Sequence, residues 1–462
     1  MKTMTTAAVP GAPARGKSLA RWSRGAGGMR RGILSRSWPL MICAALATAA
    51  SAQTEQVIQN LGGTKGDLPE SNGSLLILPS GHVIGTAMGG SKEVNAGLGV
   101  VFEAIPPAAG ESAWTYHVIH RFQGGGDGSS PANGLAQGKD GVLYGLTAWG
   151  GETNCGVVYQ LTKPTKSGTG TWEEAVLYTF GQNGAPDGCK PENTQLLFDK
   201  KTGSLYGTTE LGGTGYGTFF RLDPPQSSSD VWHESLLHEF SGELDGGYPT
   251  GGLAGDPEGG IIYGTAQIGG YGYGMVWQYN TTTGELTPAY YFAGGSDGAK
   301  PEGGVIGPFP GNVYGSEIYL LGTTAAGGGS SNCGGGCGTV FAINIPAGQA
   351  VTDSILHAFQ GTDGDEPVSG MVMSGSAAWG TALSGGGSAN CGGFGCGTLF
   401  KIQLSGFTHI ELTYAPVYNF VGGAGDGEFP ETGLVGDSSG NVIGMTAAGG
   451  ANAAGTLFEY VP

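Results

Sequence analysis

The chain has 462 residues, a formal net charge of −17 and 94 glycines, and 39% of its residues are hydrophobic. Glycine is therefore about three times as frequent as in an average protein. Apolar residues follow the glycine clusters at regular intervals, which excludes a disordered glycine-rich tract, and the three-residue period of collagen is absent. The negative charge argues against nucleic acid or an anionic lipid surface as a partner.

The first 52 residues have the pattern of an export signal peptide. They contain eight of the 20 basic residues and no acid, and they end in a basic segment, a short apolar run and small residues at 50–52. This pattern predicts cleavage near Gln53 and a secreted or periplasmic protein with a net charge of about −25. Arg30 and Arg31 resemble a twin-arginine signal, so general secretion and twin-arginine export both stay open. No stretch approaches the ~20 apolar residues of a membrane span, so we expect no membrane insertion.

A phrase like YGTT returns seven times, about 60 residues apart. The copies start at Ile84, Tyr144, Tyr206, Tyr263, Leu321, Trp379 and Ile443. A glycine-rich stretch and a segment like GTVF follow each copy, and these segments start at Gly99, Gly156, Gly217, Gly274, Gly338, Gly397 and Gly455. Both segments are rich in β-branched and aromatic residues and are bounded by glycine. We therefore expect pairs of strands joined by tight hairpins.

Each repeat also contains a strand that ends in Phe, as in AVLYTF, and then an Asp-Gly turn. The six clear turns use Asp127, Asp187, Asp245, Asp297, Asp363 and Asp426, and a degenerate seventh is Gly66-Asp67. A first strand through the segment Gly134-Leu135 and its equivalents brings each repeat to four strands. Seven four-stranded antiparallel units predict an all-β fold, a seven-bladed β-propeller that occupies residues 53–462 as one domain.

The two ends of this region belong to one repeat. Residues 56–61 read QVIQNL, like a fourth strand, and the chain stops just after the last GTVF-like segment. We therefore predict that the N-terminal strand completes the last blade and leaves no open sheet edge. Within the repeat, we expect the glycine of YGTT to let an aromatic ring of a neighbouring blade approach the backbone.

The order YGTT, GG, GTVF, LYxF and DGxxP resembles the GloVer (Gloeo/Verruco-type) tandem repeat over most of residues 56–462. This family consists of exported bacterial β-propeller-like proteins. The resemblance implies export and the propeller fold, and it implies no established activity.

Six cysteines remain after removal of the presequence, an even number that favours disulfides in an exported protein. Cys333 and Cys337 lie in one predicted loop, and Cys391 and Cys396 lie in the equivalent loop of the next repeat. Cys155 and Cys189 occupy two loops that a propeller places on the same face, so they are expected to pair. The alternative is a zinc site formed by the four cysteines at 333, 337, 391 and 396.

The repeated aspartates are interpreted as turn residues that accept hydrogen bonds from backbone amides. A ring of calcium ligands is the alternative. His120, His238 and His357 each stand two residues before the strand-ending Phe, where other copies have Tyr, and are interpreted as packing variants of an amphipathic ring. No nucleophile elbow, HExxH or phosphate loop is present, so we expect no catalytic residue, cofactor or metal.

Aromatic residues that break the repeat are the candidate ligand-binding residues. They are Trp149, Tyr216, Tyr248, Tyr271, Tyr273 and Phe394, all in loops predicted to share one face. Aromatic rings beside carboxylates suit stacking on sugar rings. The sequence therefore favours a binding or scaffold module whose partner is a polysaccharide or another exported protein. Two alternatives stay open: the rings cover neighbouring loops, or the protein is a polysaccharide lyase or hydrolase with acids in a central funnel.

Overall fold

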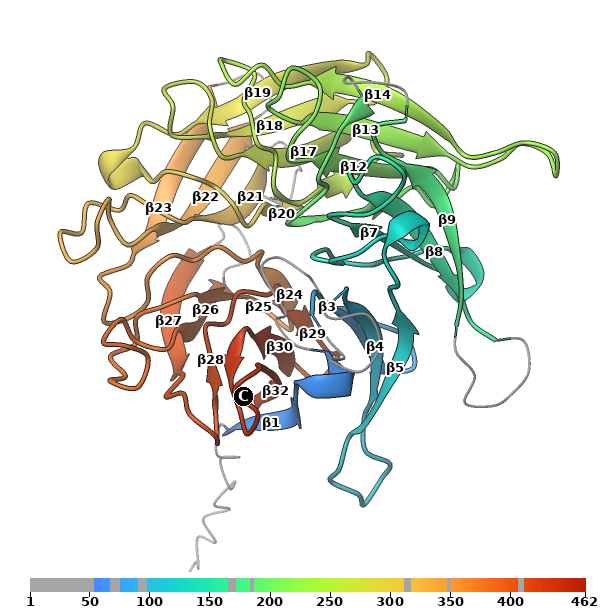
Figure 1. Ribbon diagram of the computed structural model, residues 1–462. Coiled ribbons are helices and arrows are strands. Elements are labelled where there is room, and N and C mark those ends of the chain that lie inside the picture. The colour runs from blue at the N-terminus through green and yellow to red at the C-terminus, as the bar shows by residue number, and fades with distance from the viewer. Residues whose placement is uncertain are drawn as a thin grey trace, which may run out of the picture. The chain divides into compact units, whose positions relative to one another are not determined.

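Seven four-stranded antiparallel sheets make up the computed structural model of the chain (Figure 1). The structure describes residues 54–66, 75–89, 98–164, 172–182, 187–310, 317–346, 350–405 and 411–462. The predicted export signal and the degenerate turn at Asp67 lie outside these residues. The described residues belong to one compact unit, Ser51–Pro462. They contain no α-helix, and none of their helical turns is long and apolar enough to cross a membrane.

Each four-stranded sheet is one sequence repeat, with its strands in the order from first to fourth; in blade 7 the fourth strand comes from the N-terminal end of the described chain. Blade 1 comprises β2 (Leu76–Ile77), β3 (Val83–Ala87), β4 (Val100–Ile105) and β5 (Thr115–Arg121). Blade 2 comprises β6 (Ala136–Gln137), β7 (Leu143–Thr147), β8 (Val157–Thr162) and β9 (Glu173–Thr179). Blade 3 comprises β11 (Leu197–Phe198), β12 (Leu205–Thr209), β13 (Thr218–Asp223) and β14 (His233–Glu239). Blade 4 comprises β16 (Ala254–Asp256), β17 (Ile261–Ala266), β18 (Met275–Asn280) and β19 (Glu285–Tyr291).

The last three blades follow the same order. Blade 5 comprises β20 (Val305–Pro310), β21 (Glu317–Thr324), β22 (Thr339–Pro346) and β23 (Thr352–Ala358). Blade 6 comprises β24 (Val372–Ser374), β25 (Ala377–Ala382), β26 (Thr398–Ser405) and β27 (Glu411–Asn419). Blade 7 comprises β29 (Val435–Gly436), β30 (Val442–Thr446), β32 (Thr456–Val461) and β1 (Thr54–Asn60). Short 3-10 turns are η1 (Gly63–Lys65), η2 (Gly125–Asp127), η3 (Lys139–Gly141) and η5 (Gly295–Asp297).

The N-terminal strand closes the ring of blades, as the sequence predicts. β1 pairs antiparallel with β32, from Thr54 opposite Val461 to Asn60 opposite Thr456. Figure 1 shows the blue β1 beside the red β32. The backbone N–H of Leu61 then donates to the carbonyl of Gly455 at 3.0 Å. The seventh blade thus has its full four strands, and its third strand is not left as an open edge.

The core lies between the blades. Phe219 and Phe240 of blade 3, for example, pack with Ile262 and Trp277 of blade 4, and all four side chains are fully buried. Both faces of a third strand are covered in this way, by its two neighbouring blades. Adjacent residues of that strand are therefore apolar, where a half-exposed strand would alternate apolar and polar residues.

The glycine of the YGTT segment does face an aromatic ring, but the ring belongs to the same blade. Gly207 lies directly opposite Phe220, and a Cβ added to it would lie 2.6 Å from that ring. The corresponding pairs are Gly85 with Phe102, Gly145 with Tyr159, Gly264 with Trp277, Gly322 with Phe341, Gly380 with Phe400, and Gly444 with Phe458. The prediction of a ring from a neighbouring blade is wrong. The ring folds over its direct cross-strand partner, because the flanking blades already cover the strand's outer faces.

The innermost segments connect neighbouring blades, which the sequence analysis did not predict. β10 (Thr194–Gln195) pairs parallel with β15 (Gly251–Gly252), and single parallel bridges join Gly134 to Gln195 and Gly252 to Gly304. These contacts bring backbone against backbone: a Cβ at Gly251 would lie 2.2 Å from the amide nitrogen of Gly304. A side chain has no room at this position, so glycine is required there.

Candidate functional site

One face of the ring carries both the loops between second and third strands and the segments that follow the fourth strands. We call it the loop face. The two kinds of segment touch, since short antiparallel bridges join Ser129 to Trp149, Cys189 to Leu211 and Asp365 to Ser384. All six predicted aromatic residues, all six cysteines and all six clear Asp-Gly turns belong to these segments.

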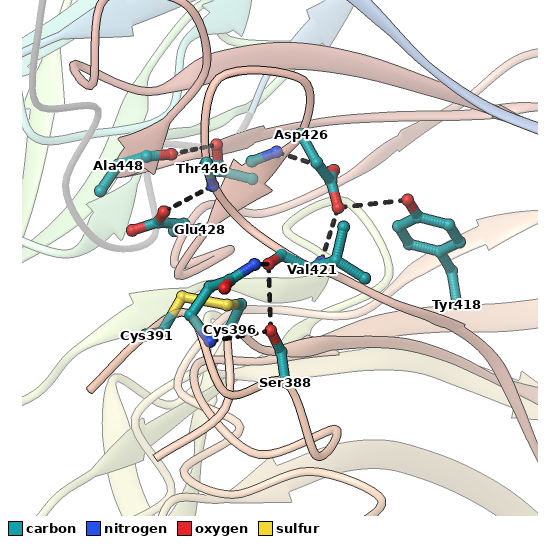
Figure 2. Close-up of a disulfide and its surroundings, with 12 residues drawn as sticks. Ser388, Cys391, Cys396, Tyr418, Val421, Asp426, Glu428, Thr446 and Ala448 are labelled. Atoms are coloured by element: carbon teal, nitrogen blue, oxygen red, sulfur yellow. Dashed lines mark hydrogen bonds between the residues drawn. A yellow bond between two sulfur atoms is a disulfide. The ribbon is translucent and has the colours of Figure 1, made fainter. Parts of the chain in front are cut away.

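Each clear Asp-Gly turn holds its aspartate in the same arrangement. The carboxylate accepts a hydrogen bond from a backbone N–H just after the strand-ending Phe and faces a ring two residues before that Phe. Asp187 accepts from the hydroxyl of Tyr178 at 2.8 Å and from the N–H of Gly181 at 2.6 Å. Figure 2 shows the equivalent bonds of Asp426, from Tyr418 at 3.2 Å and from the N–H of Val421 at 2.6 Å. The other pairs are Asp127 with His120, Asp245 with His238, Asp297 with Tyr290, and Asp363 with His357.

The histidines therefore do more than pack. His357 Nε2 lies 2.8 Å from a carboxylate oxygen of Asp363, and its ring stacks on Tyr414 at 3.5 Å. Histidine and tyrosine are interchangeable at this position because both present a polar atom at the same reach. The sequence carries the signal, because ring and aspartate keep a separation of six to nine residues in each of these turns, but their pairing becomes evident only where the turn folds back onto the strand.

The structure contains the three disulfides that the sequence predicts. Cys155 and Cys189 join the second-to-third-strand loop of blade 2 to the next linker. Cys333–Cys337 and Cys391–Cys396 each close a small loop, in blades 5 and 6. All four cysteines of the alternative zinc site are thus oxidised, which leaves no thiolate to bind the metal.

The predicted aromatic residues fall into two groups. The first group contacts neighbouring backbone or rings. Tyr216 and Tyr273 lie over Gly242 and Gly294 of the next turn, where a Cβ would be 2.6 and 2.7 Å from the ring. Tyr216 also contacts the ring of Tyr248 at 5.5 Å.

The second group contains the two most exposed of the six rings, together with Trp149. Tyr271 is 73% exposed and Phe394 is 78% exposed. Trp149 is 37% exposed, and the ammonium group of Lys190 lies 5.9 Å from its ring.

Phe394 stands in a groove between the two disulfide loops of blades 5 and 6. The groove has a volume of about 550 Å³ and is lined by residues of both loops and of the linker between them. The polar groups at its wall belong to Asn332, Gln360, Thr362, Asp365 and Ser388. This groove brings one strongly exposed ring together with amide, hydroxyl and carboxyl groups.

Asp365 is the unusual acid of the groove. Its carboxyl lies within 4.8 Å of both sulfur atoms of Cys333–Cys337. Its Oδ1 is buried and has no hydrogen-bond partner among the described residues, while Oδ2 lies 3.4 Å from the hydroxyl of Ser384. Burial raises the pKa of Asp365, because the charged form loses solvation there.

Charged residues also gather where the linkers turn towards the axis of the ring. Lys190 forms ion pairs with Glu192 at 2.6 Å and with Glu210 at 2.9 Å. Burial raises the pKa of Glu302; Lys300 acts against this rise, and the negative charges of Glu366 and Glu210 add to it. Groups from several linkers therefore lie near one another.

A separate cavity of about 210 Å³ is lined mainly by glycines and aliphatic residues at the first strands. A cavity of that size is small for a ligand site. The groove at Phe394 is the better candidate.

Seven repeats of a four-stranded antiparallel sheet, closed by strands from both ends of the chain, define a β-propeller. The model of the Gloeobacter/Verrucomicrobia repeat family matches residues 70–320. The chain belongs to this family.

Two solved structures are similar to the chain at low sequence identity. TolB from Acinetobacter baumannii matches at 15% identity and a TM-score of 0.38, over 77% of this chain and 65% of the TolB chain. The PQQ-bound form of aldose sugar dehydrogenase from Streptomyces coelicolor matches at 12% identity and a TM-score of 0.38, over 88% of this chain and 98% of that one. No curated protein matches the sequence.

Proposed function

We propose that this protein is an exported binding module and that the groove between its two disulfide loops holds a carbohydrate chain. The observation that carries the proposal is the position of Phe394. Covering an apolar ring that is 78% exposed with the flat face of a ligand lowers the free energy of the complex. The surrounding hydroxyl, amide and carboxyl groups suit the hydroxyls at the edge of a sugar ring.

The walls of the groove are held in place before a ligand arrives. The disulfide Cys333–Cys337 closes one wall and Cys391–Cys396 closes the other, so few residues lose freedom on binding. The same disulfides support export, since such bonds persist in oxidising compartments. Trp149 and Tyr271 lie on the same face and extend the proposed surface beyond the groove.

Binding to polysaccharides tests the proposal. The purified protein is screened on a glycan array and by affinity electrophoresis in plant and microbial polysaccharides. We expect Phe394→Ala to weaken binding about tenfold, because loss of a stacked ring costs roughly 1.4 kcal/mol. Val231→Ala is the matched control, since Val231 is 73% exposed in the loop between β13 and β14. Binding that survives Phe394→Ala, Trp149→Ala and Tyr271→Ala together would remove the proposal's support.

Asp365 favours a second candidate function, a polysaccharide lyase or hydrolase. A carboxyl of raised pKa in a groove can donate a proton to a leaving oxygen. The same polysaccharides are therefore assayed for release of reducing ends. Release that Asp365→Asn abolishes, with retention on the polysaccharide unchanged, would establish the enzyme; retention without release supports the binding module.

A further inference from the structure

Four contacts between neighbouring blades contain a second carboxyl group beside the aspartate of an Asp-Gly turn. The second acids are Glu55, Glu174, Glu234 and Asp353, which lie on the fourth strands of blades 7, 2, 3 and 5. They occupy one repeat position. Each lies opposite the residue five positions after the glycine that starts a GTVF-like segment, namely Tyr460, Leu161, Leu222 and Ile343. The other three blades have Tyr116, Leu286 and Tyr414 there. The strand pairing alone therefore shows that an acid recurs at this position of the repeat.

Each second acid faces the turn aspartate that ends the preceding blade. Glu174 and Asp127 interact through their side chains, as do Asp353 and Asp297. Glu55 feels the charge of Asp426 and shares the hydroxyl of Tyr418 with it. Glu234 feels the charge of Asp187. Each pair joins the fourth strand of one blade to the turn that ends the previous blade.

Within the described residues, one histidine and four tyrosines face these pairs. The groups that face them are His120 and Tyr159 at the Glu174 pair, Tyr178 at the Glu234 pair, Tyr290 at the Asp353 pair, and Tyr418 at the Glu55 pair. One oxygen each of Glu55, Glu174 and Glu234 is buried and receives no hydrogen bond within the described part of the chain. Two ionised carboxylates in contact repel each other, whereas one proton between them makes a hydrogen bond.

We propose that each of these four carboxyl pairs shares one proton, and that the contacts between blades are therefore stronger at acidic than at alkaline pH. In the three pairs that contain a glutamate, the protonated glutamate donates to the ionised aspartate, which keeps its bonds to the turn. In the pair of Asp353 with Asp297, the proton lies between two aspartates, and burial raises the pKa of Asp297. The arrangement makes the propeller most stable in an acidic environment.

The expected pKa values agree with this assignment. Burial, and then the charge of the neighbouring aspartate, raise the pKa of Glu55, Glu174 and Glu234 from 4.5 to about 7. Burial opposes the ionisation of Asp127, but the His120 ring nitrogen 3.6 Å away and the hydrogen bond from the N–H of Gln123 outweigh this effect and lower its pKa. The proton therefore resides on the glutamate of that pair.

The sign of the pH dependence follows from linkage. The folded protein holds these protons up to about pH 7, whereas the unfolded chain releases them near pH 4.5. Between these values the folded state binds more protons, so the free energy of unfolding falls as pH rises. Below pH 4.5 both states are protonated, and the contribution no longer changes.

Thermal unfolding between pH 5 and pH 8, in EDTA, tests the proposal. We expect a Tm several degrees higher at pH 5 than at pH 8 for the unmodified protein. Glu174→Gln with Glu234→Gln supplies permanent amide donors, so this variant should gain Tm at pH 8, keep its Tm at pH 5 and show a flatter profile. Glu173→Gln is the matched control, because Glu173 is the exposed neighbour on the same strand, and should keep the original slope.

A slope that is unchanged in the double variant would overturn the proposal. A direct measurement covers the case in which the variant does not fold. The ¹³C carboxyl resonances of glutamate in the unmodified protein should include signals that titrate near pH 7. Titration of every glutamate below about pH 5.5 would also overturn it.

Discussion

At the scale of the residue, the glycine of each second strand is fixed by space and not by backbone conformation. Gly207 has no positive φ, yet an added Cβ would lie 2.6 Å from Phe220 and 2.9 Å from Leu196. Both neighbours are fully or almost fully buried and have no room to move. The sequence shows that this glycine recurs, but the identity of the ring comes from the strand register.

Substitution of this glycine tests the packing. We expect Gly207→Ala to lower the free energy of unfolding by about 1–3 kcal/mol, the usual cost of overpacking a core. Gly126→Ala is the control, because a Cβ there meets no atom within 4 Å and the φ angle is not positive. Its effect should stay within about 0.5 kcal/mol. Chemical denaturation measures both, and equal effects of the two substitutions would contradict the packing argument.

At the scale of the element, each of the six linkers with a clear Asp-Gly turn also contains a non-glycine residue of positive φ. Lys190 and Tyr248, for example, have φ of 56° and 52°. The N–H of Lys190 donates to the carbonyl of Cys155, and its own carbonyl accepts from Glu210. The linker is thus hydrogen-bonded to the blades on both sides, which accounts for a backbone conformation that is unfavourable outside glycine. The sequence predicts the turn, but not this double attachment.

The disulfides differ in the length of chain that they close. Cys155 and Cys189 are separated by 34 residues, against 5 for Cys391 and Cys396. Loop-closure entropy then predicts a loss of about 4 kcal/mol for the double substitution Cys155→Ser with Cys189→Ser, and about 2 kcal/mol for the same change at Cys391 and Cys396. Denaturant unfolding of the two variants measures the difference. A greater loss from the short loop would show that loop length does not govern these bonds.

At the scale of the whole molecule, stability depends on closure of the ring by β1. A chain that starts at Gly62 would expose the edge of β32 along its length, from Thr456 to Val461. Unpaired strand edges pair with other chains, so we expect this variant to aggregate and to lose its cooperative unfolding. Size-exclusion chromatography and circular dichroism measure both effects.

A circular permutant provides the control for this truncation. Because Thr54 lies opposite Val461, residues 54–61 can be moved behind Pro462 through a two-residue Asn-Gly turn. This permutant should recover a monomeric, cooperatively folded protein. A truncated chain that stays monomeric with an unchanged Tm would show that closure is not required.

The sequence by itself determined the number of blades, the four strands of each and the closing strand. The blades and their strands follow from local patterns that recur in each repeat, so a single chain provides seven readings of them. For four of the cysteines the sequence left a zinc site open, and the structure decided for disulfides. Only the tertiary structure decided which side chains meet across blades: the turn aspartates with their rings, Phe394 with the opposite loop, and Glu55 with Asp426 from the other end of the chain. Such meetings depend on how neighbouring sheets pack and on the closure of the ring, and no local pattern of residues carries that geometry.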